Sequence, residues 1–190
     1  YGALGEIVTE KSGNLNLGVP GVMYMGGIAG LMGAFFYENG NPAPNGFVGL
    51  VISFLCAFLA GILGGLIYSI LTITLRANQN VTGLALTTFG TGFGNFFGGS
   101  LSALAGGVGQ ISVASTGAAY AKTIPGLSRI PVIGPVLFSY GFMTYLCIIL
   151  ACVLAFFLSK TRKGLNLRAV GENPATADAA GINVTLYKYL

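Results

Sequence analysis

The stretch GFVGLVISFLCAFLAGILGGLIYSILTITL, residues Gly46–Leu75, runs for 30 residues without a charged side chain. A helix of about 20 apolar residues is enough to cross a bilayer. The surplus length predicts that this helix tilts, kinks near Gly64-Gly65, or projects beyond the bilayer. The stretch therefore indicates that the chain belongs to the membrane proteins built from helices.

The composition of the whole chain agrees with a membrane environment. Charged residues make up 7% of the 190 residues, hydrophobic residues make up 54%, and the mean hydropathy is +0.78. Ordinary soluble domains carry about 25% charged residues, so a soluble globule is disfavoured. The net charge of +4 comes from Lys and Arg residues that mostly flank apolar runs. This pattern is typical of membrane topology and not of a nucleic-acid partner.

Residues that bind metals or perform catalysis are scarce. The sequence has no histidine, and Cys56, Cys147 and Cys152 each lie within an apolar run, where cysteine serves as a small buried side chain. It also has no Gly-x-x-x-x-Gly-Lys-(Ser/Thr) phosphate loop and no paired acid and base. We therefore expect no metal site, no cofactor bound by this chain and no enzymatic activity.

The apolar runs and the polar residues between them predict an all-α, polytopic transmembrane bundle. The predicted spans are about residues 15–37, 46–75, 81–104 and 137–159. Gly18, Pro20 and Gly21 lie near the start of the first span and predict a broken helix there, which protein or a wet cavity must cover. Because the sequence begins at Tyr1 and ends in an apolar-looking run, we expect a fragment of a larger protein.

The remaining segments are predicted to lie outside the spans. Residues 105–136 are rich in Gly and Pro and predict an extracytoplasmic loop with possible re-entrant pieces. Residues 160–190 are predicted to hold a cytoplasmic segment and the start of the next span. This orientation follows from the excess of Lys and Arg on one side. That side carries Arg76, Lys160, Arg162, Lys163, Arg168 and Lys188, and the other carries Glu38, Lys122 and Arg129.

The span at 81–104 combines a glycine ridge with polar side chains. Gly90, Gly94 and Gly98 fall four residues apart on one helical face, a spacing that lets membrane helices approach closely. The polar residues favour a second possibility, a helix beside a solute path, while caps and interhelical hydrogen bonds remain the simpler explanation. The candidate path residues are Asn14, Asn16, Thr87, Thr91 and Asn95.

The polar stretch GLNLRAVGENPATADAAGIN, Gly164–Asn183, predicts a short helix at the membrane surface. Asn173-Pro174 is a strong helix start and Gly181 a natural stop. The side chains between them are almost all small, so the helix can fit a groove of a soluble partner, with Gly164–Gly171 as its tether. The candidate contacts are Glu172, Asn173, Pro174, Ala175, Asp178, Ala179, Ala180 and Gly181.

At these residues the sequence resembles a known family. RAVGENPATADAAGIN, residues 168–183, is similar to the cytoplasmic coupling segment of permease subunits in bacterial ABC importers of ribose-type sugars, branched-chain amino acids and nucleosides. GEIVTEKSGNLNLGVPGVMYMG, residues 5–26, resembles the family's opening motif, although Pro20 stands where the subgroup commonly has Glu. TLRANQNVTGLAL at 74–86 and IPGLSRIPVIGP at 124–135 resemble blocks of the nucleoside and simple-sugar subgroup.

The resemblance implies how such a protein would work. It implies a permease in the cytoplasmic (inner) membrane that carries a nucleoside or simple sugar. Its expected partners are membrane lipid, an ATP-binding subunit that binds ATP and Mg²⁺, a second permease subunit in a homo- or heterodimer, and an extracytoplasmic solute-binding protein. A secondary transporter or channel is the alternative, but such carriers more often place ionisable residues within their spans. A membrane enzyme is disfavoured because no catalytic constellation is present.

Overall fold

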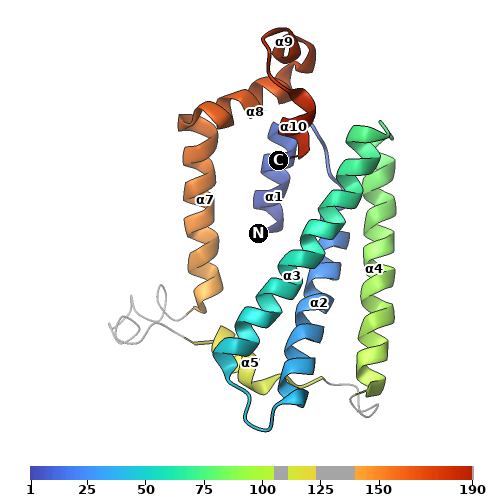
Figure 1. Cartoon of the computed structure of the whole chain (residues 1–190), viewed down its shortest axis with the longest axis vertical. Coiled ribbons are helices and arrows are strands. Elements are labelled where there is room, and N and C mark those ends of the chain that lie inside the picture. The colour runs from blue at the N-terminus through green and yellow to red at the C-terminus, as the bar shows by residue number, and fades with distance from the viewer. Residues whose placement is uncertain (105–110, 123–139, 190) are drawn as a thin grey trace.

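The computed structural model describes residues 1–104, 111–122 and 140–189, and all regular secondary structure in these ranges is helical. Long helices lie roughly side by side and shorter ones close the two ends (Figure 1). The elements are α1 (Gly2–Lys11), α2 (Val19–Gly40), α3 (Gly46–Ser69), the π-helical η1 (Ile70–Thr74), α4 (Gln79–Leu104), α5 (Ala114–Tyr120), α7 (Phe142–Lys160), α8 (Arg162–Glu172), α9 (Pro174–Ala179) and α10 (Val184–Tyr189).

The stretch Gly46–Leu75 forms α3 and η1, nearly as predicted. The Asn45 side chain accepts a hydrogen bond from the Phe47 amide at 3.0 Å and caps the start. Together α3 and η1 hold 29 residues, about 43 Å of helix, which exceeds a hydrocarbon core of about 30 Å. The helix runs obliquely across α2 and α4 (Figure 1), and its tilt relative to a bilayer stays a prediction. It is continuous at Gly64-Gly65, and its hydrogen-bond pattern changes only in η1.

Three described helices are long and apolar enough to cross a membrane, namely Val19–Gly40, Gly46–Thr74 and Phe142–Lys160. The first is the most enclosed by protein, while the other two leave most of their surface free. Phe58 and Leu63 of α3, for example, are 57% and 60% exposed, as suits side chains that face lipid. Helix α4 coincides with the predicted span 81–104 but is more polar, and its crossing stays a prediction.

The predicted break near the first span exists but lies earlier in the chain than expected. Residues Ser12–Gly18 are not helical, and α2 begins at Val19 instead of Leu15. Pro20 lies in the first turn of α2, where its missing N–H costs no intrahelical hydrogen bond. The break is also preceded by helix α1, which the sequence did not predict. Pro20 and Gly21 are therefore part of α2 and not of the break.

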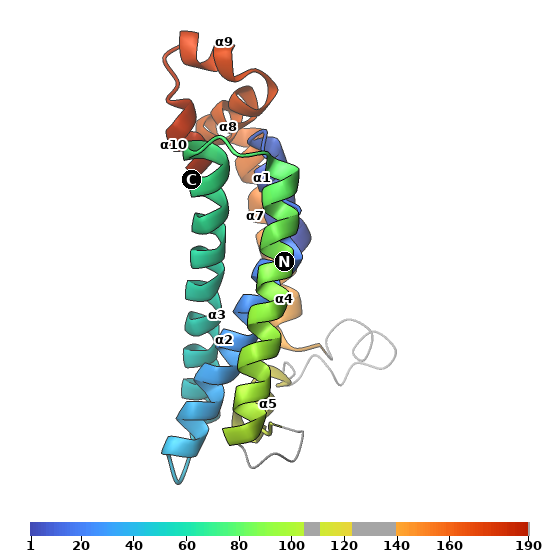
Figure 2. The same cartoon turned by 90° about the vertical axis from the view of Figure 1, so that its right-hand side faces the viewer.

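The two ends of the bundle differ in the elements that close them. Helices α8, α9 and α10 lie at one end and α5 at the other, in both views (Figures 1 and 2). Glu38 at the end of α2 accepts hydrogen bonds from the Thr116 and Ser115 amides at 2.7 and 3.4 Å, which ties α5 to α2. The predicted loop 105–136 contains α5, while 105–110 and 123–136, with Arg129, lie outside the described residues.

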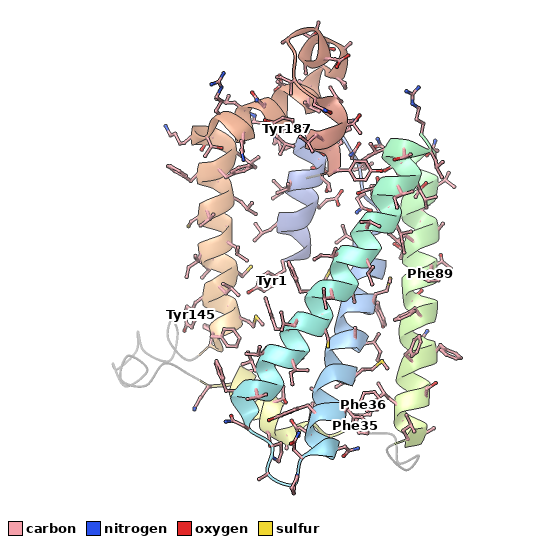
Figure 3. All side chains as sticks on the ribbon, in the orientation of Figure 1. Tyr1, Phe35, Phe36, Phe89, Tyr145 and Tyr187 are labelled. Atoms are coloured by element: carbon pink, nitrogen blue, oxygen red, sulfur yellow. The ribbon has the colours of Figure 1, made fainter. Side chains whose placement is uncertain are left out.

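Helix α1 links the bundle to the other long helix, α7. The hydroxyl of Tyr1 donates to the Met143 carbonyl of α7 at 2.5 Å (Figure 3). At the opposite end of α1, a Cβ on Gly171 of α8 would lie only 2.2 Å from the Lys11 carbonyl oxygen. Glycine at this position therefore lets α8 pack directly on the backbone at the end of α1.

Candidate docking surface and solute path

Helix α9 has the start and stop that its sequence predicts. The Asn173 side chain accepts a hydrogen bond from the Thr176 amide at 3.1 Å, and Pro174 is the first helical residue. Gly181 has a φ of +80°, a conformation that favours glycine after a helix. Its amide donates to the Asp178 carbonyl at 2.9 Å. The helix itself ends at Ala179, so Ala180 and Gly181 form the turn that follows it.

One face of α9 is buried and the other faces are free. Ala177 is 4% exposed and belongs to the contact with α8, whose Leu167 and Val170 are also buried. All eight candidate contacts are exposed, namely Glu172, Asn173, Pro174, Ala175, Asp178, Ala179, Ala180 and Gly181. The predicted tether is not an irregular linker, because Gly164–Gly171 lies within helix α8.

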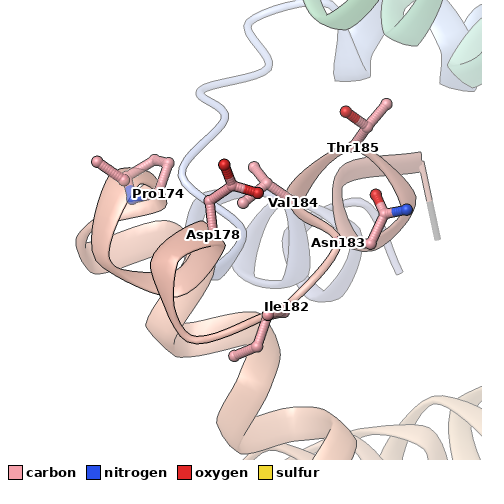
Figure 4. A pocket seen from close by; sticks show the side chains of 8 residues that line it. Pro174, Asp178, Ile182, Asn183, Val184 and Thr185 are labelled. Atoms are coloured by element: carbon pink, nitrogen blue, oxygen red, sulfur yellow. The ribbon is translucent and has the colours of Figure 1, made fainter.

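A depression of about 610 Å³ lies between α9 and α10. Its side chains are short and include one carboxylate, that of Asp178 (Figure 4). Glu172, Asn173, Ala179 and Ala180 are not part of its wall. The residues that line it are Pro174, Ala175, Asp178, Gly181, Ile182, Asn183, Val184 and Thr185. The depression is thus an open surface that a complementary segment of another protein can enter without displacing a bulky side chain.

The candidate path residues are not gathered in one cavity. Asn14 and Asn16 lie in the break and are 4% and 8% exposed. Asn16 lines an open groove of about 500 Å³ formed by α1, α2 and α3, whose wall also holds Phe54 and Phe58. The rings of these two phenylalanines are stacked with centroids 6.4 Å apart. Asn14 is not in the wall of this groove.

The polar residues of α4 occupy three different environments. Thr87 Oγ1 donates to the Leu17 carbonyl at 2.8 Å, while Thr91 Oγ1 is hydrogen-bonded to the carbonyls of Thr87 and Thr88 in its own helix. Asn95 is exposed, and its side chain has no hydrogen bond within the described part of the chain. Of these three side chains, only that of Asn95 makes no hydrogen bond within the described residues, so its amide is free to bond a solute.

The glycine ridge of α4 faces α2. A Cβ on Gly90 would lie 2.3 Å from the Gly21 carbonyl oxygen, so the two backbones are in direct contact. A Cβ on Gly94 would lie 2.6 Å from a ring carbon of Tyr24, and one on Gly98 would lie 3.5 Å from Ile28. The contact is therefore tightest at Gly90 and loosens toward the α5 end.

Sequence reasoning missed several residues that hold the break in place. Tyr68 donates from its hydroxyl to the Leu15 carbonyl at 2.5 Å, and Gln79 accepts from the Leu15 amide at 2.9 Å. The sequence could have indicated the role of Tyr68, because it is a single tyrosine within an apolar run and a buried hydroxyl normally requires a hydrogen-bond partner. Gln79 offered no such signal, since it lies in a polar turn where a solvent-exposed amide is unremarkable.

These features define a polytopic helical membrane protein. Two of its helices pack through glycines, and a helix of small residues is exposed at one end. The chain belongs to the family described as the permease component of the branched-chain amino acid transport system, which it matches over residues 2–190. No solved structure matches the chain significantly.

Individual relatives are permeases as well. The guanosine ABC transporter permease protein NupQ of Bacillus subtilis is 37% identical over an alignment of 191 positions that covers 99% of this chain and 56% of that protein. The nucleoside ABC transporter permease protein NupC of Lactococcus lactis is 32% identical over 100% of this chain and 57% of its own length. A putative glucose ABC transporter permease, TsgC13 of Haloferax volcanii, is 31% identical over 98% and 52%. The chain thus spans about half the length of the curated relatives it matches.

Proposed function

We propose that the chain is part of the transmembrane permease subunit of an ATP-binding-cassette importer that carries nucleosides across the cytoplasmic membrane, with a simple sugar as the alternative solute. The observation that carries this proposal is the exposed, short-residue surface of α9 and its depression of about 610 Å³ beside α10. Similarity to guanosine and nucleoside permeases supports the choice of solute.

In this proposal the α9–α10 surface receives an ATP-binding subunit. That subunit binds ATP and Mg²⁺, since this sequence has no phosphate loop of its own. The surface lies at the end of the bundle where α7 ends and α8 begins (Figure 1), with Lys160 and Arg162 at these helix ends, and the charge rule assigns this end to the cytoplasm. A solute-binding protein would meet the α5 end, and a second permease subunit would complete the pathway.

Transport then requires the helices to change their relative positions. The α2 and α4 backbones touch at Gly21 and Gly90, so these two helices are expected to move together. Helix α7 packs mainly on α8 and contacts the other long helices much less. Movement of the α8–α9 unit by the ATP-binding subunit would therefore shift α7 against the α2–α4 pair and alternate access to the solute path.

The test is an arginine placed in the depression. Ala175→Arg puts a long cation where the partner is expected to dock, so solute-stimulated ATPase and ATP-dependent guanosine uptake should both fall at least about tenfold. The matched control is Ala169→Arg, the same change at an exposed position of α8 outside the depression. The measurement uses the complete permease reconstituted with its ATP-binding and solute-binding proteins in vesicles.

Two outcomes would contradict the proposal. Normal ATPase stimulation in Ala175→Arg would exclude the docking role of the depression. Uptake by the unmodified complex that proceeds without ATP, driven by an ion gradient, would exclude an ATP-binding-cassette importer and favour a secondary transporter. If glucose, but no other nucleoside, competes with guanosine for uptake, the simple sugar is the solute.

A further inference from the structure

The break between α1 and α2, residues Ser12–Gly18, is held by hydrogen bonds from other helices. Tyr68 of α3 donates to the Leu15 carbonyl at 2.5 Å, and Gln79 at the start of α4 accepts from the Leu15 amide at 2.9 Å. Backbone groups outside a helix require such partners where water is excluded. Helices α3 and α4 therefore help to fix the conformation of the break, together with a carboxylate of α1 that accepts from its backbone at 3.1 Å.

Asn14 connects this break to α10, the helix that follows α9 in the chain. Its side chain is 4% exposed, and its Oδ1 accepts hydrogen bonds from Gln79 Nε2 at 3.2 Å and from Lys188 Nζ at 3.4 Å. Lys188 belongs to α10, and the hydroxyl of the next residue, Tyr189, is hydrogen-bonded to the Thr74 hydroxyl of η1. Asn14 thus receives donors from α4 and α10 on one oxygen.

Lys188 differs from the other cations at this end of the bundle. Its ammonium donates to a buried side-chain oxygen at 3.4 Å, near the long limit for a hydrogen bond, and so meets one defined partner. Lys160, by contrast, is exposed and makes no hydrogen bond through its side chain within the described residues. Lys188 therefore offers a specific contact, whereas Lys160 contributes only charge.

We propose that Lys188 and Asn14 are positioning residues that transmit displacement of α9 and α10 to the break and, through Gln79, to α4. The inference rests on the proposed function, because it assumes that a partner moves α9. A shift of α10 alters the contact that Asn14 shares with Gln79, which accepts from the Leu15 amide and is itself the first residue of α4. Asn14, a candidate for the solute path from sequence, is thereby assigned to the coupling between docking and transport.

The experiment measures how many solute molecules enter per ATP hydrolysed in the reconstituted complete transporter. Lys188→Met removes the ammonium but keeps the length of the side chain, and should lower this ratio about tenfold, within the range usual for coupling between sites. Lys188→Arg restores a cationic donor and should return the ratio to within about twofold of the unmodified protein. The control Lys160→Met loses the same charge at the same end and should leave the ratio unchanged.

A double variant tests whether Asn14 and Lys188 act through one contact. If they do, Asn14→Ala combined with Lys188→Met lowers the ratio no further than the more severe single change. A normal ratio in Lys188→Met, or single effects that multiply, would overturn the linkage. Should Asn14→Ala fail to assemble, the Lys188 variants decide alone, because neither alters the break itself. If the unmodified complex shows no ATP-dependent uptake, the proposed function is wrong. This outcome differs from a loss of coupling that is confined to Lys188→Met.

Discussion

Two regions of this protein use small residues in opposite ways. Between α2 and α4, glycine brings two backbones together, so that a Cβ on Gly90 would lie 2.3 Å from the Gly21 carbonyl oxygen. On α9 and in the turn that follows it, small residues leave a surface open, and a Cβ on Gly181 would have no atom within 4 Å. The same residue types therefore fix one region and leave the other available to a partner. Whether a small residue serves helix packing or leaves a docking surface depends on the atoms around it and not on the residue type.

The largest effect is expected from a bulky residue in the fixed region. Gly90→Leu forces the α2 and α4 backbones apart and should destabilise the permease by about 3 kcal/mol, near the top of the range for overpacking. The measurement is thermal stability of the purified protein in detergent, followed by size-exclusion chromatography. Gly92→Leu is the matched control, because a Cβ at Gly92 meets no atom within 4 Å. Equal losses in both variants would contradict the assignment of the ridge to helix packing.

A smaller loss is expected where α8 meets the end of α1. A Cβ on Gly171 would lie 2.2 Å from the Lys11 carbonyl oxygen, and this atom belongs to backbone that cannot rotate away. Gly171→Ala should therefore cost about 2 kcal/mol, because one added methyl displaces less than a leucine does. Loss of stability, measured as above, should be accompanied by faster proteolysis near Gly13. Unchanged proteolysis and stability would show that α1 and α8 are not in contact in the membrane.

The sequence predicted those parts of the fold that depend on local chemistry. The uncharged run Gly46–Leu75 predicts a spanning helix longer than a bilayer requires, and Asn173, Pro174 and Gly181 predict a short helix with its caps, since neither prediction needs knowledge of distant residues. The four-residue spacing of Gly90 and Gly94 indicates close packing but cannot name the partner helix. That α2 is this partner depends on tertiary structure.

The candidate site was harder to predict because its contacts join distant parts of the chain. Asn14 meets Gln79 and Lys188, which are 65 and 174 residues away in sequence, and no pattern in a single sequence reveals such pairs. From the sequence, five polar residues were therefore proposed for a solute path, with caps and interhelical hydrogen bonds as the simpler explanation. The structure separates them, because Asn16 lines a groove, Thr91 bonds within its own helix and Asn95 is exposed.

The smallest effect is expected at the glycine of the open region. Gly181 has a φ of +80°, and an alanine there adopts the left-handed conformation at a cost of about 1 kcal/mol. Because nothing lies within 4 Å of the added methyl, Gly181→Ala should leave the fold intact and loosen only the turn between α9 and α10. Hydrogen exchange at the Gly181 and Ile182 amides, which bond to Asp178 and Ala177, should quicken while the α2 and α4 amides stay protected. Slower exchange at these two amides, or a stability loss as large as that of Gly171→Ala, would mean that the α9–α10 turn is packed and not open.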